Sequence, residues 1–490
     1  MPSLHIPQWG RFEQRFAVAD SPLHFTQSWV SATFSCGDES KHVYGFYDDK
    51  GEFVVRFMPG IPGEWQFTIA SNITELNGIS GRFFCASEPH EKGPVQRDGN
   101  LHFRRANGEP WYPFGTTAYV WNYQSEAVQA DTLASLAASP FNKIRMCVFP
   151  KHYRYNLAEP ARFPFPGSIQ DGFDYSRFDV AFFAGLEKQI DALAKLGIEA
   201  DLIIFHPYDR WGFSQMSQEV DQRYIRYLVA RLASFKNIWW SLANEFDLLT
   251  EKPMHFWDAA IAQIKREDPS EHLMSIHNWH NPPIHYRSNA HWYDHHNPAL
   301  THASIQHHDM HFVPEWRETF AKPIVIDECC YEGNVDLGWG NITAQKMVEL
   351  FWHGVCLGGY VTHGETWLSD DEIIWWSHGG KLKGESVTRI AFLRQLLEEG
   401  EAKRLTPMPW DIHWDTSMGM SDDKWGLFYF GDHCPGYKMM TMLPPDTVWK
   451  IDIIDTWAMT ITPVAETIRQ GDKLMLPGKP WIALRLQRIS

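Results

Sequence analysis

The sequence lacks several features that would place it in one of the large classes of protein. No stretch approaches the roughly 18 consecutive apolar residues that span a bilayer, so we expect no membrane segment. Residues 1–10 hold neither a basic segment nor a continuous apolar run, and therefore predict no secretory signal. The seven cysteines are an odd number, and their spacings match neither a disulfide framework nor a zinc ribbon. A reducing cytoplasm is the compartment that fits them best.

The composition is that of a soluble protein with more than one domain. At 490 residues the chain is too long for one ordinary domain. Its apolar residues (44%) and charged residues (21%) are enough to build complete cores. A net charge of −16 disfavours nucleic acid or an acidic membrane surface as a partner. The 23 tryptophans exceed what packing usually demands, and Trp-rich clefts suit sugars, which have flat apolar faces.

Both ends of the chain are predicted to be β-structure. In residues 1–95, Trp65, Phe67 and Ile69 alternate with polar residues, which is the period of a half-buried strand. No helix-length periodic segment interrupts this region, so we expect an N-terminal β-sandwich. The polar residues 88–100 are typical of a linker. Alternating strands return in residues 401–490 and predict a small C-terminal β-sandwich.

Residues 101–399 alternate predicted strands with predicted helices, which is the pattern of βα units. Leu186, Ile190 and Leu193 have helical spacing, and Gly197 follows where a C-terminal cap belongs. Eight strands over about 300 residues match a (β/α)8 TIM barrel. A doubly wound open sheet is the alternative, but no glycine-rich phosphate loop supports it. The predicted strands are residues 111–120, 142–149, 198–206, 238–244, 273–277, 303–306, 323–327 and 359–363.

Two of these strands end in a glutamate. Residues 237–246 are largely apolar up to Asn244 and Glu245, and residues 322–328 repeat the arrangement with Glu328 at the end. A carboxylate at the end of a strand buried on both faces is costly unless it has a use. In a barrel, this end of the strands carries the catalytic groups. Strands four and seven face each other across an eight-stranded ring, so Glu245 and Glu328 can converge on one ligand.

A pair of glutamates at the mouth of a barrel is suited to cleaving a glycosidic bond with retention. One carboxylic acid protonates the leaving oxygen, and a carboxylate roughly 5–5.5 Å away attacks the anomeric carbon. Asn244 could hydrogen-bond a hydroxyl of the sugar next to the scissile bond. This chemistry requires no cofactor and no metal, and its partner is a carbohydrate substrate.

The chain also resembles a known family over essentially its full length. Asn244-Glu245 at the end of strand four, with Glu328 at the end of strand seven, is similar to the retaining glycoside hydrolases of clan A. Within that clan the chain resembles bacterial glycosidases that join an N-terminal β-sandwich, an apiosidase-like barrel and a C-terminal β-domain. The short motifs that carry the resemblance are Gly45-Phe-Tyr-Asp48, Arg56-Phe-Met-Pro59, Gly63-Glu-Trp65, Pro113-Phe-Gly-Thr-Thr-Ala-Tyr119, Lys143-Ile-Arg-Met146, Ala243-Asn-Glu-Phe246 and Thr362-His-Gly-Glu-Thr-Trp367.

The resemblance implies roles for individual residues. The family pattern makes Glu245 the acid/base and Glu328 the nucleophile. It places Arg145 at the tip of strand two, where it would orient the nucleophile, and Trp367 at strand eight, as a stacking floor for the sugar. Glu365 is the main alternative to Glu328 for the role of nucleophile. Strand alternation allows only one of Asp327 and Glu328 to point into the mouth of the barrel.

Histidines at strand ends leave several interpretations open. His206, His277 and His363 end three of the predicted strands. They could form a metal centre, which would make the protein a metal-dependent barrel hydrolase. They could instead hydrogen-bond sugar hydroxyls, as Glu365 could, or they could cap and pack. We take His206, His277, His363 and Glu365 as candidate substrate contacts.

Tryptophans in the predicted loops are harder to explain as core than those in strands. Stacking against a sugar is expected for about half of them. A non-catalytic carbohydrate-binding protein would use the same residues, and a glycan lyase is a further alternative. The loop tryptophans are Trp121, Trp279, Trp292, Trp339, Trp375 and Trp376.

Overall fold

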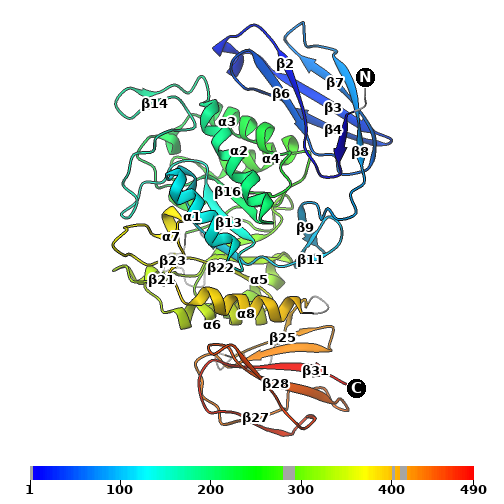
Figure 1. Cartoon of the computed structure of the whole chain (residues 1–490), viewed down its shortest axis with the longest axis vertical. Coiled ribbons are helices and arrows are strands. Elements are labelled where there is room, and N and C mark those ends of the chain that lie inside the picture. Colours follow the sequence, from blue (N-terminus) through cyan, green and yellow to red (C-terminus); the bar gives the residue numbers. More distant parts are fainter. Residues whose placement is uncertain (1–3, 280–292, 400–402, 409–415) are drawn as a thin grey trace.

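The computed structural model describes residues 4–279, 293–399, 403–408 and 416–490. Three parts follow one another along the long axis of the molecule: sheets of the N-terminal part, a helix-wrapped barrel, and the sheet of the C-terminal part (Figure 1). Within the described residues, no helix combines the length and the apolar character needed to cross a membrane. Trp292, one of the loop tryptophans expected to stack on a sugar, lies outside the described residues.

The N-terminal part is built from two sheets that pack face to face. One has the strand order β1-β8-β7-β3-β4 and the other β2-β6-β5. The turn of residues 48–51 joins β5 and β6 as an antiparallel hairpin. Phe12 and Phe34 come from different sheets, and their rings lie 5.5 Å apart in the core between them. The strands are β1 (His5–Pro7), β2 (Phe12–Ala17), β3 (Val30–Cys36), β4 (Glu39–Tyr44), β5 (Phe46–Tyr47), β6 (Glu52–Phe57), β7 (Gly63–Ser71) and β8 (Ser80–Ala86).

A small three-stranded sheet connects this part to the barrel. It has the order β11-β10-β9, from β9 (Val95–Asp98), β10 (His102–Arg105) and β11 (Pro110–Trp111). Part of the stretch expected to be a linker is therefore paired as a strand. Only Val95 of this strand is buried, and its other residues are polar. The polar composition therefore indicated a linker and not a strand.

Eight parallel strands form the predicted barrel. Their order is β18-β17-β16-β13-β12-β22-β20-β19, and a parallel bridge between His277 and Ser304 links the two ends of that order. Seven of the strands lie inside the predicted ranges, and β20 ends one residue beyond its range, at Glu328; most are shorter than predicted. They are β12 (Gly115–Thr117), β13 (Lys143–Cys147), β16 (Glu199–Phe205), β17 (Ile238–Ala243), β18 (Met274–Ser275), β19 (Ala303–Gln306), β20 (Ile324–Glu328) and β22 (Tyr360–His363).

Helices surround the barrel in Figure 1. α2 ends where predicted, and Gly197 adopts the left-handed conformation (φ 72°) that lets the chain turn back into β16. Ser125, Ser217 and Thr343 cap the N-termini of α1, α3 and α6 with side-chain oxygens. The helices are α1 (Glu126–Ala137), α2 (Val180–Lys195), α3 (Gln218–Leu232), α4 (Met254–Glu267), α5 (Val313–Phe320), α6 (Ala344–Cys356), α7 (Trp375–His378) and α8 (Ser386–Glu398).

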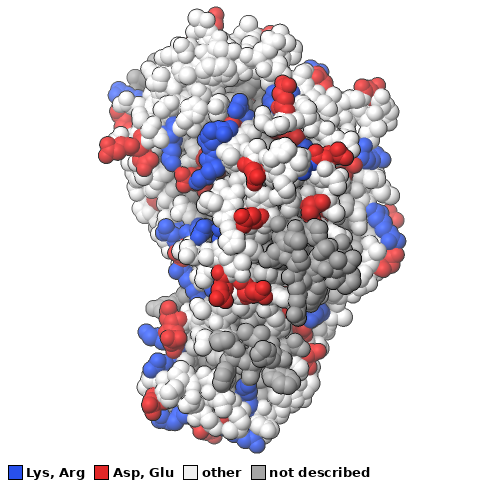
Figure 2. Space-filling model, turned by 180° about the vertical axis from the view of Figure 1, so that it is seen from behind, with Lys and Arg blue, Asp and Glu red and all other residues white. Residues whose placement is uncertain are grey.

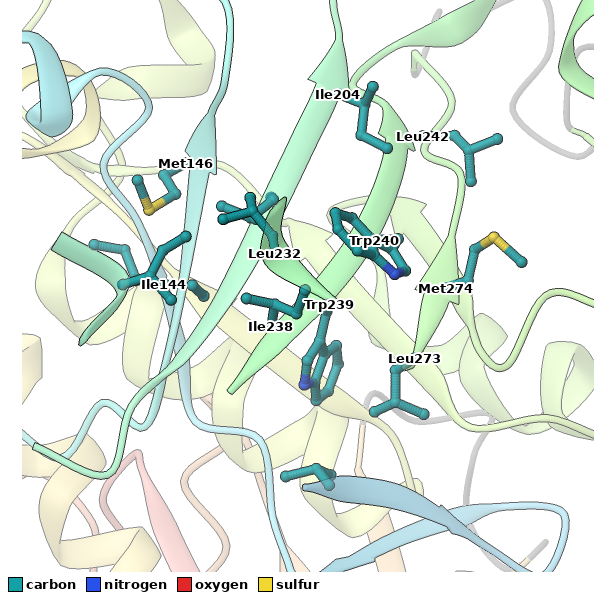
Figure 3. Packing of buried hydrophobic residues seen from close by; sticks show 14 of the residues in the cluster. Ile144, Met146, Ile204, Leu232, Ile238, Trp239, Trp240, Leu242, Leu273 and Met274 are labelled. Atoms are coloured by element: carbon teal, nitrogen blue, oxygen red, sulfur yellow. The ribbon is translucent and has the colours of Figure 1, made fainter. Parts of the chain in front are cut away.

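Apolar side chains fill the space between strands and helices. All six residues of β17 are buried, as expected for a parallel strand covered on both faces. Figure 3 shows Trp239 and Trp240, which are successive residues of this strand, on opposite sides of it. Leu232 of α3 and Met274 of β18 pack near them (Figure 3). The strand is therefore held on both faces up to its carboxyl end.

Charged side chains tie the N-terminal part to the barrel. Arg56 of β6 contacts Glu187 of α2 at 2.8 Å, and Arg231 of α3 contacts both Glu187 (2.6 Å) and Asp48 (2.8 Å). Arg56 and Arg231 are both buried. Because an unpaired buried charge is costly, these ion pairs fix how the first sandwich sits on α2 and α3.

The C-terminal part is a six-stranded antiparallel sheet with the order β24-β25-β26-β31-β28-β29, and the pair β27-β30 lies with it. A separate apolar cluster around Phe428, Trp449 and Leu484 fills this part. It packs on α6, as Figure 1 shows. The strands are β24 (Thr406–Pro407), β25 (Ser417–Ser421), β26 (Trp425–Tyr429), β27 (Tyr437–Met439), β28 (Trp449–Asp455), β29 (Thr460–Pro463), β30 (Lys473–Met475) and β31 (Ile482–Arg488).

Basic and acidic side chains are interspersed over the face of the molecule seen in Figure 2. Partly or fully exposed ion pairs such as Lys92 with Glu109 and Arg394 with Glu398 occur on the surface of the protein. Pairs of this kind contribute little stability each.

Candidate active site at the mouth of the barrel

Glu245 and Glu328 line the same cavity at the carboxyl ends of the barrel strands. Its volume is about 450 Å³, within the usual range for small-molecule sites. Glu245 directly follows β17 and Glu328 is the last residue of β20. The walls are rich in aromatic residues: Tyr119, Tyr153, Tyr208, Trp279, Tyr331, Trp339 and Trp376.

Glu328 is surrounded by hydrogen-bond donors. The hydroxyl of Tyr119 donates to Oε1 at 2.5 Å, and the hydroxyl of Tyr331 donates to Oε2 at 2.7 Å. Arg145 Nη1 lies 3.3 Å from Oε1. His277 Nε2 lies at the same distance from that oxygen. Both carboxylate oxygens are thus held in fixed positions.

These contacts keep Glu328 ionised. Burial by itself raises the pKa of this carboxyl, but the hydrogen bond and charge of His277 and the charges of Arg145 and Lys151 outweigh it. The pKa of Glu328 is therefore held well below the usual range of a glutamate. An ionised carboxylate at neutral pH is what a nucleophile requires.

Glu245 is in the opposite electrostatic situation. Burial, together with the charge of Glu328, raises its pKa to about 7, and Lys151 and the hydrogen bond from Tyr208 only partly offset this. The carboxyl group of Glu245 therefore holds its proton up to neutral pH. Two carboxyl groups with pKa values moved in opposite directions are the signature of an acid and a nucleophile in one site.

The backbone at Glu245 is strained. Its φ of 50° lies in the left-handed region, which is unfavourable for a residue with a Cβ. The neighbouring amides fix this conformation, because Asn244 N donates to Phe205 O and Phe246 N donates to His277 O. The strand end is thereby turned so that the carboxyl group faces the cavity.

Gln306 and His277 bridge the two glutamates. With its amide nitrogen turned toward the site, Gln306 donates to Glu245 Oε1 at 3.2 Å, and the same nitrogen lies 3.3 Å from His277 Nε2. His277 in turn lies against Glu328 and contacts Ser304 Oγ through Nδ1 at 3.0 Å. The two acidic side chains therefore belong to one connected hydrogen-bonding network.

Arg145 connects Glu328 to the residue before Glu245. Its Nη2 donates to Asn244 Oδ1 at 2.9 Å while Nη1 faces Glu328. With its oxygen held by Arg145, the Asn244 side chain has its amide nitrogen left to donate. Asn244 lines the cavity, so that amide is available to a sugar hydroxyl.

Asp327 lies beneath the cavity. Lys143 Nζ donates to it at 2.7 Å, and Ser304 and Thr362 donate to it as well. Lys143 also pairs with Asp201 at 2.7 Å. These buried ion pairs occupy the interior of the barrel, and they leave Glu328 as the member of the Asp327-Glu328 pair that lines the cavity.

Glu365, the competitor for the nucleophile role, belongs to a separate buried cluster. Backbone amides of Lys383 and Gly384 donate to its two oxygens, and those of Glu385 and Ser386 donate to Glu332. Four consecutive amides before and at the start of α8 thus hold two carboxylates. Burial, with the charge of Glu332, raises the pKa of Glu365 to about 7. Neither carboxylate is among the described residues that line the cavity.

The same cluster contains a group of side chains that could bind a metal ion. Glu332, His363 and Glu365 have ligand atoms within 4.8 Å of one another, and no other such group is found in the described parts of the chain. Burial lowers the pKa of His363 to about 3, so its ring is neutral, and Phe141 stacks on it at 4.6 Å. His206 and His277 do not belong to this group. The strand-end histidines named from the sequence are therefore not gathered into one centre.

The remaining predicted substrate contacts lie outside the cavity lining. His206 is buried and bonds the carbonyl of Phe149 at 3.2 Å. Trp121 is fully buried, with its indole against Met146. The indole of Trp367 donates to Glu332 at 3.3 Å. Of the other loop tryptophans, Trp279, Trp339 and Trp376 line the cavity, and Trp375 donates to Thr116 in the core.

Sequence reasoning missed the tyrosines and one lysine of the site. Tyr119, Tyr208 and Tyr331 follow strand ends by two to three residues, a position that could have marked them. Lys151, four residues after β13, lines the cavity beside both glutamates. The prediction favoured histidines and tryptophans because imidazoles bind metals and indoles stack on sugars, whereas a tyrosine in a loop is less specific.

Comparison with known proteins agrees with this geometry. Residues 97–411 match the family described as the apiosidase-like catalytic domain. The chain belongs to that family. Its family and its relatives make the protein an enzyme of the glycoside hydrolase class. The flanking residues 5–72 and 414–487 match two families described as domains of unknown function, DUF5060 and DUF5605.

Solved structures extend the likeness over the whole chain. A crystal structure of a candidate glycoside hydrolase from Bacteroides vulgatus ATCC 8482 is 37% identical, with a TM-score of 0.93, and covers 99% of this chain and 100% of that one. A glycoside hydrolase family 5 structure from the same organism is 14% identical (TM-score 0.63) over 81% of this chain and 94% of that one. At that identity only the fold is shared. Comparison with curated proteins finds no match.

Proposed function

We propose that this apiosidase-like enzyme cleaves a glycosidic bond with retention of configuration, with Glu245 as acid/base and Glu328 as nucleophile. The observation that carries the proposal is the opposite pKa shift of two glutamates that line one cavity. The substrate is an oligosaccharide or glycoside, which the aromatic walls suit because sugar rings present apolar C–H faces.

In the first step, Glu245 donates its proton to the glycosidic oxygen as the bond from that oxygen to the anomeric carbon breaks. A carboxylate oxygen of Glu328 attacks the same carbon and forms a glycosyl ester. Tyr119 and Tyr331 hold Glu328 in place during the attack. Asn244 donates to a hydroxyl of the bound sugar, a contact that strengthens in the transition state.

In the second step, Glu245, now ionised, removes a proton from water. The resulting hydroxide attacks the anomeric carbon, and the ester bond to Glu328 breaks, which returns Glu328 as a carboxylate. The charge on Glu328 disappears while the ester exists. Glu245 is then no longer beside a negative charge, so its pKa falls and it becomes a suitable base.

The test is a screen of aryl glycosides and oligosaccharides with the wild type, Glu245→Ala and Glu328→Ala. Azide should restore turnover to Glu328→Ala with a glycosyl azide of inverted configuration, and to Glu245→Ala with a retained one. Glu365→Ala is the matched control, because azide should not raise its rate. Azide products from Glu365→Ala in place of Glu328→Ala would transfer the nucleophile role to Glu365.

We further propose that the enzyme acts in the cytoplasm on small imported glycosides. All seven cysteines are free, and Cys85, Cys147, Cys329 and Cys356 are buried, which suits a reducing compartment. Fractionation of the cells that produce the protein, with activity measured in each fraction, tests this.

A further inference from the structure

Lys151 differs from the other buried lysines of the structure. Lys143, Lys252 and Lys322 each place the ammonium group within 2.7 Å of an oxygen, from Asp201 and Asp327, Asp221, and the carbonyl of Asn297 respectively. Lys151 is 3% exposed, yet among the described residues its ammonium has neither an ion-pair partner nor a hydrogen-bond acceptor. A buried ammonium with three donors and no acceptor is costly.

The ammonium of Lys151 lies in the cavity, among aromatic rings. Its Nζ is 3.6 Å from the ring centre of Tyr119, 4.3 Å from that of Tyr208 and 4.6 Å from that of Trp376. Tyr119 donates to Glu328 and Tyr208 donates to Glu245. Lys151 is therefore placed between the two side chains that hold the glutamates. A sugar bound for reaction must pass within its reach.

Among the described residues, no carboxylate forms an ion pair with this ammonium. Glu328 already receives Arg145, Tyr119 and Tyr331, and Glu245 carries its own proton at neutral pH. The rings offset part of the cost through cation–π attraction, but they cannot accept three conventional hydrogen bonds. The arrangement is a cationic subsite that a ligand completes.

We propose that the cavity accepts a sugar bearing a carboxylate, a uronic acid, with Lys151 as the ion-pair partner of that carboxylate. The inference rests on the proposed function, because it assumes that the sugar lies between Glu245 and Glu328. A carboxylate supplies two oxygens to an ammonium and a full opposite charge, whereas a hydroxyl supplies one neutral oxygen. The cavity is lined largely by aromatic side chains, and an ion pair partly shielded from water discriminates more strongly than one at an exposed surface.

The experiment uses pairs of 4-nitrophenyl glycosides that differ only at C6: glucuronide against glucoside and galacturonide against galactoside, in both anomeric forms. For the wild type, kcat/KM should favour the acid of at least one pair by about tenfold or more. Lys151→Met keeps an unbranched side chain as far as Cε and removes the charge, and should lower the acid-to-neutral ratio by about 10²- to 10³-fold. Lys151→Arg should retain most of the preference. The ratio is the readout because Lys151 also influences both glutamates.

A second measurement separates this inference from the proposed mechanism. Binding of free glucuronate, galacturonate, glucose and galactose is measured by calorimetry on the wild type and on Lys151→Met. The inference is supported if the wild type binds an acid more tightly than its neutral sugar and Lys151→Met loses this difference. That result holds even if Glu328→Ala proves to retain turnover. A wild type that prefers the neutral sugar of every pair, in both turnover and binding, or an unchanged ratio in Lys151→Met, overturns it.

Discussion

The carboxyl groups of Glu245 and Glu328 face one cavity from the ends of β17 and β20, and the charge of Glu328 raises the pKa of Glu245. This relationship suits the two glutamates to the different roles proposed for them, Glu245 as the acid and Glu328 as the nucleophile. Donors to Glu328 make the difference: two tyrosines, an arginine and a histidine surround it. Glu245 accepts from Tyr208 and Gln306, both of which are neutral.

The first prediction concerns the pH dependence of kcat/KM. The reaction requires Glu245 protonated and Glu328 ionised. Because the pKa of Glu245 is raised to about 7, activity should be present below this pH and should fall about tenfold per unit above it. On the acid side of the profile, activity should persist below the usual pKa of a glutamate, because the pKa of Glu328 is lowered. A pH–rate profile with the alkaline limb near pH 4.5 would contradict the assignment of Glu245.

The second prediction concerns Tyr208→Phe. The hydroxyl of Tyr208 donates to Glu245 and lowers its pKa, so removal of this donor should raise that pKa. We expect the alkaline limb to move up by about one pH unit, since a hydrogen bond to a charged group is worth about 1.5 kcal/mol or more. Tyr153→Phe is the control, because Tyr153 lines the same cavity without a hydrogen bond to Glu245 among the described residues. Equal shifts in both variants would show that the effect is one of packing.

The third prediction concerns Tyr119→Phe and Tyr331→Phe. Each variant removes one donor to Glu328, at 2.5 and 2.7 Å. The carboxylate becomes more basic and less firmly held, so kcat/KM should fall about 10- to 100-fold and the acid limb should move to higher pH. Tyr155→Phe is the comparison, because its hydroxyl bonds Asp336 at the surface. A loss of activity with an unmoved acid limb would mean that the tyrosines bind substrate instead.

The fourth prediction concerns stability and the Glu332–Glu365 cluster. The pKa of Glu365 is raised to about 7 in the folded protein, so the protonated form is the one that folding favours. Its contribution is complete below the unfolded pKa of about 4.5 and is lost as pH rises through 7. Glu365→Gln, which is neutral at every pH, should therefore gain stability relative to the wild type between pH 5 and 8, by up to about 3 kcal/mol.

Urea unfolding at several pH values measures this difference. Glu332→Gln is the matched variant, because it removes the neighbouring charge that raises the pKa of Glu365. The pH-dependent part of the stability should shrink in that variant too, whatever its absolute stability. A constant difference between Glu365→Gln and the wild type across this range would show that Glu365 is ionised in the folded state.

Much of the architecture was predictable because buried strands and helices have characteristic patterns of apolar residues in the sequence. The apolar run that ends in Glu245 marks a strand covered on both faces, and helical spacing around Leu186 marks α2. The strand β9 was not predicted, because only Val95 in it is buried. Short strands such as β18 were predicted too long, since hydrogen-bond pairing, and not apolar character, ends a strand.

The sequence by itself determined the barrel, the two flanking β regions and the pair of strand-end glutamates, because these depend on local periodicity and on the order of elements along the chain. Only the tertiary structure decided which carboxyl holds a proton, which tryptophans line the cavity and where Lys151 lies. Those properties depend on side chains brought together from distant segments, and the electrostatic field at each group is the sum over neighbours that no local pattern specifies. Tyr119 and Glu328, separated by more than two hundred residues, are in contact only because the barrel closes.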